Sequence, residues 1–110
     1  MVVIMREPDI EAIISTVRTE EGGRIYPFFN GYRPDHLVME DYLTTGVHNY
    51  YDKDFIPIGE SALGTITFIT PEEYPNCLWD GKVINIQEGS RVVGYATVTK
   101  IFNEMLRANE

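Results

Sequence analysis

Residues 63–70 have the sequence LGTITFIT, and this stretch decides the fold class. Its side chains fall into two alternating sets, and the set formed by residues 64, 66, 68 and 70 is the more apolar. A period of two is typical of a β-strand with one face against a protein core. We therefore predict a strand here, with Ile66 and Phe68 in its more apolar set.

Similar short runs of β-branched and aromatic residues recur along the chain between Gly, Pro, Asn and Asp turn residues. They predict further strands at residues 10–18, 36–43, 46–51, 82–87 and 91–101. Gly89 and Ser90 lie between the last two runs and suit the two-residue turn of an antiparallel hairpin. Six short strands predict an all-β fold, either a closed antiparallel barrel or a sandwich. Residues 102–107 (FNEMLR) predict a short helical tail.

The length and composition indicate one globular domain over residues 1–110. The chain has 110 residues, of which 44% are hydrophobic and 24% charged, values within the ordinary globular range. Its one cysteine, Cys77, cannot form an internal disulfide, so we expect a cytoplasmic protein and a buried structural thiol. We expect neither a signal peptide nor a membrane span, because the charge-free residues 61–71 fall far short of about 20 apolar residues.

The negative charge is concentrated in the middle of the chain. Residues 35–80 contain nine acids and one base, Lys53, which gives them the whole net charge of −8. The simplest interpretation is a solvated face. Because nucleic-acid affinity depends largely on Lys and Arg contacts to phosphates, this segment should repel RNA and DNA.

No catalytic motif or cofactor motif is evident. The chain has neither a phosphate-binding glycine loop nor a complete nucleophile elbow around Ser61. His36, Asp41 and His48 leave open a metal or enzyme site, but their spacing matches no known ligand motif. We therefore expect a protein that is not an enzyme and that has no cofactor and no metal.

Two segments add a family resemblance. Residues 20–34 (EEGGRIYPFFNGYRP) and the later pair 86–94 (IQEGSRVVG) and 98–100 (VTK) resemble the third, C-terminal β-barrel domain of bacterial elongation factor Tu. The resemblance covers about residues 10–101 and implies a six-stranded antiparallel barrel. It also implies a free-standing relative of one domain, without the GTPase domain of the family.

The resemblance further implies a binding surface, since the family's third domain contacts the GTPase domain and the T stem of aminoacyl-tRNA. The positions that correspond to this surface are Arg33, Asp35, Thr44 or Thr45, Glu88 and Gly89. An extra residue leaves open which threonine matches. Arg24 and Arg91 also match arginines of the family pattern.

Several positions depart from the family pattern toward acidic or apolar residues. Asp35 replaces a Gln, residues 39–41 (MED) replace Arg-Thr-Thr, and Gln87 replaces an Arg. Fewer phosphate contacts weaken RNA affinity. We therefore expect a non-catalytic protein-interaction module linked to translation, whose partner is a GTPase domain or another translation component. The alternative is a weak tRNA- or RNA-binding module.

Overall fold

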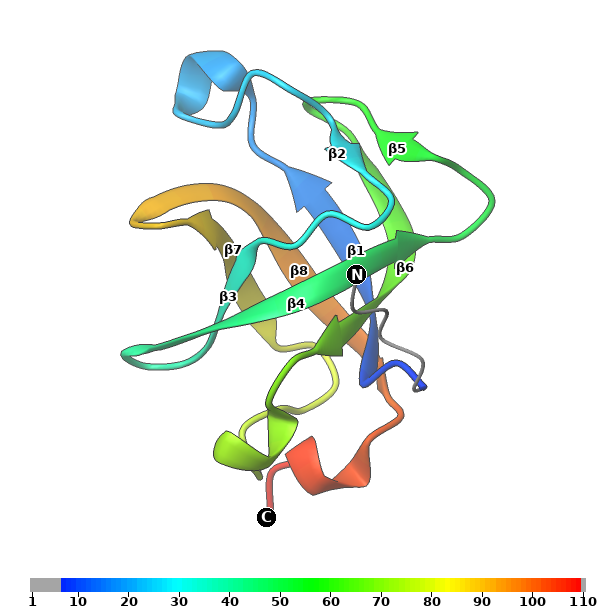
Figure 1. The fold of residues 1–110 in the computed structure, drawn as a ribbon, viewed down its shortest axis with the longest axis vertical. Helices are drawn as coiled ribbons and strands as arrows, with labels where there is room; N and C mark the ends of the chain where they lie inside the picture. Colours follow the sequence, from blue (N-terminus) through cyan, green and yellow to red (C-terminus); the bar gives the residue numbers. More distant parts are fainter. Residues whose placement is uncertain (1–6, 110) are drawn as a thin grey trace.

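The computed structural model describes residues 7–109 and shows a six-stranded antiparallel β-barrel (Figure 1). The strands are β1 (Ile10–Thr16), β3 (Asp35–Met39), β4 (Tyr42–Tyr50), β6 (Ser61–Phe68), β7 (Val83–Glu88) and β8 (Arg91–Ile101). Around the barrel they follow the order β1-β6-β4-β3-β7-β8, and β8 pairs back onto β1. The predicted all-β class is confirmed, and the closure of the sheet decides for a barrel over a sandwich.

Short elements cover the two ends of the barrel. At one end, β2 (Phe28–Phe29) and β5 (Phe55–Ile56) form a two-stranded sheet (Figure 1). Residues 7–109 also contain three 3-10 turns: η1 (Thr19–Glu21), η2 (Pro71–Glu73) and η3 (Glu104–Leu106). Residues 7–109 contain no α-helix.

The core fills the interior of the barrel, and the alternation of residues 63–70 shows why. Gly64, Ile66 and Phe68 of β6 are buried, whereas Leu63 remains 40% exposed, so the more apolar set faces inward as the period of two requires. Each fully buried Ile or Phe stabilises the fold by about 1.5–3 kcal/mol. The other strands add the buried residues Ile10, Ala12, Ile14, Val38, Ile84, Ile86, Val93, Ala96 and Val98.

The prediction of one strand at residues 36–43 and another at 46–51 is wrong in its boundaries. The chain turns at Glu40 and Asp41, so β3 ends at Met39 and a single long strand, β4, runs from Tyr42 to Tyr50. Asp41 adopts a φ of 63°, a left-handed conformation that Asp tolerates better than most residues. The remaining four strands lie close to their predicted positions, and β8 coincides with its prediction.

The predicted helical tail is also wrong, because residues 102–107 form only the 3-10 turn η3. Asn103 accepts a hydrogen bond from the Met105 N–H at the start of this turn. The Leu78 N–H donates to the Leu106 carbonyl, and the Ala108 N–H donates to the Leu78 carbonyl. These long-range bonds hold the chain extended after Arg107, whereas a segment this short gains little from forming an isolated helix.

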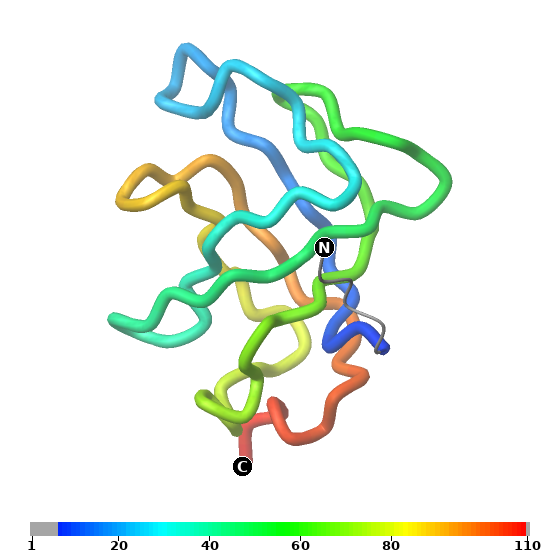
Figure 2. Tube along the Cα trace, in the orientation of Figure 1, coloured from blue at the N-terminus to red at the C-terminus, as the bar shows by residue number. Residues whose placement is uncertain are grey.

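The seam between β1 and β8 joins the two ends of the described chain. Both the Phe102 and Asn103 N–H groups donate to the Asp9 carbonyl, so the first and last barrel strands emerge side by side (Figure 2). The Asp9 carboxylate is fully buried and accepts hydrogen bonds from the Phe68 N–H and from Asn103 Nδ2. None of the helical segments described for residues 7–109 has the length and apolar character to cross a bilayer.

Candidate functional site

The two segments that carry the family resemblance meet at one end of the barrel. Residues 20–34 contribute Arg24 and Tyr32, and the β7–β8 hairpin contributes Glu88. Arg24 Nη1 lies 2.7 Å from Glu88 Oε2, and the Tyr32 hydroxyl donates to the same oxygen. With Phe28, whose ring packs 4.7 Å from that of Tyr32, these residues form what we call the Arg24 cluster.

The loop before β2 positions the Arg24 cluster. Gly22 ends η1 with a φ of 100°, a conformation that glycine adopts without a steric penalty. At Gly23 an added Cβ would lie 2.1 Å from the Val17 carbonyl oxygen, so only glycine allows the loop to close so tightly on the end of β1. The Thr19 hydroxyl donates to the Arg24 carbonyl at 2.8 Å and thereby fixes the backbone from which the arginine side chain extends.

Charge and burial give the cluster a supporting role in the fold. The Arg24 side chain is only 18% exposed, and its guanidinium carbon lies 4.5 Å from the centre of the Tyr32 ring. Burial, together with the hydrogen bond to Glu88, raises the pKa of Tyr32. Tyr32 therefore remains protonated and donates to the carboxylate over the whole physiological pH range. The Glu88 side chain itself is 41% exposed and remains accessible to a partner.

Most of the predicted site residues lie on the barrel surface beside this cluster. Asp35 on β3 pairs in register with Thr45 on β4 and with Gln87 on β7. The Thr45 hydroxyl donates to Asp35 Oδ1 at 3.2 Å, and Gln87 Nε2 donates to the Gly89 carbonyl at 2.9 Å. Gly89 has a φ of 63° at the hairpin turn, which favours glycine there.

Two arginines flank this row. Arg33 lies two residues before Asp35, and Arg91 pairs with Glu88 across the hairpin turn. Both arginine residues are exposed. Arg33, Asp35, Thr45, Glu88 and Gly89 therefore share one end of the barrel.

Thr44 is separated from the other predicted site residues. It is 5% exposed, and its hydroxyl lies 3.0 Å from that of Tyr74 in the interior. Neighbouring strand residues point to opposite faces, so Thr45 rather than Thr44 has its side chain outside the barrel. The sequence left this choice open because the register of β4 was not known.

The two histidines form a buried chain of hydrogen bonds inside the barrel. His36 and His48 are both fully buried, and their Nε2 atoms lie 2.8 Å apart. His36 Nδ1 lies 3.3 Å from the Thr44 carbonyl, which can only accept, so this nitrogen carries the proton. His36 Nε2 therefore accepts from His48 Nε2, and His48 Nδ1 accepts from the Tyr50 hydroxyl 2.8 Å away. Every ring nitrogen thus has a partner when both rings are neutral.

Burial keeps these rings neutral, which fits a structural role better than a metal or enzyme site. Desolvation lowers the pKa of His36 to about 4 and that of His48 well below its usual value. Asp41, by contrast, is exposed in the β3–β4 turn. Within residues 7–109 no group of three or more His, Cys, Asp or Glu side chains is placed to hold a metal ion.

Cys77 is buried and free, in line with the expected structural thiol. Burial raises the pKa of the thiol, which makes the reactive thiolate scarce at neutral pH. Lys82 lies nearby and donates to the carbonyls of Cys77 and Val38. These contacts tie the residue before β7 both to β3 and to the segment that contains Cys77, and they engage the lysine ammonium with backbone carbonyls.

No family model matches this sequence. The structure itself establishes an all-β chain with a closed six-stranded barrel. The sequence pointed to most of the residues at the Arg24 end of the barrel but did not reveal that Arg24, Tyr32 and Glu88 bind one another. The signal was an arginine and an aromatic residue within one matched segment and an acid in the other.

Proposed function

We propose that this chain is a non-catalytic protein-interaction module of the elongation factor Tu third-domain type, linked to translation in the cytoplasm. The observation that carries the proposal is an uncharged surface on the outside of the barrel. Contiguous exposed apolar side chains are a feature of interaction sites in soluble proteins.

This surface is a row of side chains in register across four strands. Leu63 on β6 pairs with Ile13 on β1, Ile13 pairs with Thr97 on β8, and Thr97 pairs with Val83 on β7. Leu63, Ile13 and Val83 are 40%, 44% and 57% exposed. Tyr95, 42% exposed, lies in the adjacent register position. We use the name apolar row for the four residues in register together with Tyr95: Leu63, Ile13, Thr97, Val83 and Tyr95. None of these five side chains is charged.

The resemblance to elongation factor Tu supports the link with translation. The resemblance implies a six-stranded antiparallel barrel, and the chain has this architecture. The residues matched at the two ends of the sequence also lie together, because Arg24 and Glu88 form an ion pair. We infer from this that the barrel binds a GTPase domain or another translation component through its surface and has no catalytic activity of its own.

Binding assays with purified components test this proposal. Tagged protein is mixed with an elongation factor Tu GTPase domain and, separately, with ribosomes, and a lysate pull-down is divided into untreated and RNase-treated halves. We expect capture of a translation component that survives RNase and weakens when Val83→Asp places a charge in the apolar row. Ile69→Asp is the matched control, since Ile69 is similarly exposed at 51% but lies outside the row. Equal capture by both variants, or no captured translation component, would refute the proposal.

Weak tRNA or RNA binding is the second candidate function, and the exposed Arg33 and Arg91 beside the Arg24 cluster favour it. The test is a tRNA titration at about 50 mM salt, where phosphate contacts are strongest. RNA binding predicts that Arg33→Ala and Arg91→Ala each weaken the complex. Lys100→Ala, at the opposite end of β8, is the charge-matched control. Absence of any tRNA shift at this salt concentration would exclude this candidate.

A further inference from the structure

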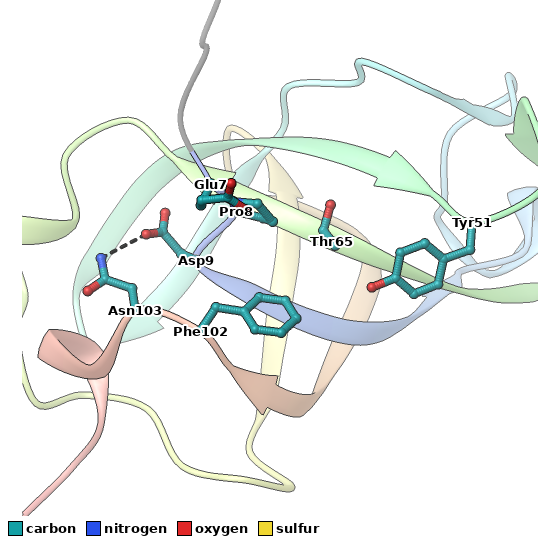
Figure 3. A pocket seen from close by; sticks show the side chains of 7 residues that line it. All are labelled: Glu7, Pro8, Asp9, Tyr51, Thr65, Phe102 and Asn103. Atoms are coloured by element: carbon teal, nitrogen blue, oxygen red, sulfur yellow. Dashed lines mark hydrogen bonds between the residues drawn. The ribbon is translucent and has the colours of Figure 1, made fainter.

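An open surface pocket of about 630 Å³ lies where β1 begins and β8 ends. Phe102, Tyr51 and Pro8 line it, and Thr65 of β6 also contributes (Figure 3). Figure 3 shows the Tyr51 ring directed from one side toward the space beside Phe102. Phe102 is 47% and Tyr51 38% exposed, so two aromatic rings are available to a bound group.

Acidic side chains accompany these rings. Glu7 lines the pocket and is exposed. Glu11 on β1 lies next to it, since Glu11 pairs in register with Thr65 and its Oε2 accepts from the Tyr51 hydroxyl at 2.9 Å. Asp9 also lines the pocket, but its carboxylate is fully buried.

Glu11 contributes a negative charge, which the nearby Lys100 on β8 attracts without forming an ion pair with it in the described residues. Glu11 is 8% exposed, and its carboxylate accepts hydrogen bonds from two neutral hydroxyl groups, those of Thr99 and Tyr51. The Thr99 bond is the main reason why its pKa is lowered, so the carboxylate is ionised at neutral pH. Lys100 is its neighbour on β8, yet within residues 7–109 no lysine or arginine nitrogen forms an ion pair with it.

Building on the proposed interaction function, we propose that this pocket binds the cationic side chain of a lysine or arginine in a basic segment of the partner protein. A cation is attracted by the faces of aromatic rings and by the carboxylates of Glu7 and Glu11. The aliphatic part of the same side chain packs against Pro8 and Phe102, as long basic side chains commonly do on apolar surface. A neutral apolar group would instead desolvate these charges without compensation, and an anion would be repelled.

The test is an NMR titration of the full chain with short blocked peptides. The probes are acetyl-Gly-Lys-Gly-amide and acetyl-Gly-Arg-Gly-amide, and the matched neutral probe carries norleucine in place of lysine. We expect saturable shifts at Tyr51, Thr65 and Phe102 with the cationic peptides and no saturable shifts with norleucine. Equal shifts with norleucine, or none with either cation, would overturn the proposal.

Variants assign the binding to this pocket. Phe102→Ala should weaken cationic-peptide binding at least about fivefold, the loss of about one cation–π contact. Phe29→Ala is the control, because Phe29 is similarly exposed, at 52%, but does not line the pocket. Glu7→Gln, an exposed substitution that leaves the rings in place, should weaken binding in the same direction. An equal effect of Phe102→Ala and Phe29→Ala would count against the pocket.

Three further outcomes separate this proposal from its alternatives. Binding that occurs only after deletion of residues 2–6 would identify the chain's own N-terminal segment as the occupant and overturn the proposal. If the capture assays find no translation component but the cationic peptides still bind, the proposed function is refuted and the cation preference of the pocket is supported. Intact partner capture without peptide binding would refute the pocket alone.

Discussion

Lowering the pH from 7 to 5 should destabilise the barrel through its buried histidines. His36 and His48 have lowered pKa values because the interior disfavours a charged imidazole. In the unfolded chain both rings take up a proton near pH 6.5. The unfolded state therefore binds more protons than the folded state below this pH. Stability is full above about pH 6.5 and is lost as the pH falls toward the folded-state pKa.

The magnitude follows from His36. With a folded-state pKa of about 4 and an unfolded value of about 6.5, it alone lowers the free energy of unfolding by about 2 kcal/mol between pH 7 and pH 5. His48, whose pKa is also strongly lowered by burial, acts in the same direction. The loss from His36 alone is already a substantial part of the roughly 5–15 kcal/mol that stabilises a typical domain.

Urea denaturation followed by far-UV circular dichroism at pH 7, 6 and 5 measures this loss. Glu11, the carboxylate with a lowered pKa, titrates below this window and so leaves the histidine effect separable. In parallel, histidine NMR signals of the folded protein should show no titration between pH 7 and 5. A free energy of unfolding that stays constant over this range, or folded-state histidine signals that titrate near pH 6.5, would refute the reasoning.

Three other substitutions or reactions test separate parts of the structure. Arg24→Ala should lower the free energy of unfolding by about 1–3 kcal/mol in urea denaturation, since it removes a partly buried ion pair and a ring contact. Arg91→Ala, at an exposed site, should change it by less than about 0.5 kcal/mol. Gly94→Ala should lower the free energy of unfolding by about 3 kcal/mol or more, because the new Cβ would lie 2.5 Å from the Ser15 carbonyl oxygen. Thermal unfolding measures this effect, and an unchanged melting temperature would contradict that geometry. Cys77 should react with a thiol reagent far more slowly in the native protein than in urea, because it is 6% exposed and burial raises its pKa; equal rates would show that the thiol is accessible.

The sequence predicted strands well where one face is buried and apolar. Residues 63–70 and 91–101 alternate clearly, and their strands lie where the pattern placed them. The strand boundaries predicted within residues 36–51 are wrong, because Asp41 forms a tight turn without glycine or proline to mark it. The strands β2 and β5 are only two residues long and have too little pattern to be recognised.

The interior polar groups and the binding surfaces were harder to predict. On β4, Thr44, His48 and Tyr50 have side chains that point into the barrel. Their burial could not be predicted without the register of the strand. The apolar row depends on four strands in register, and the surface pocket lined by Phe102 and Tyr51 depends on the closure of β8 onto β1. Such long-range pairings leave no local trace in the sequence.

The seam between β1 and β8 also determines when the barrel can be completed during synthesis. One edge of β1 has no barrel partner until residues 91–101 are available, because β8 follows every other barrel strand in the sequence. A growing chain that ends before β8 exposes this edge and part of the core, and such states tend to aggregate. Barrel closure therefore waits until β8 has been made, and folding should be slow because the contacts of the barrel are predominantly long-range.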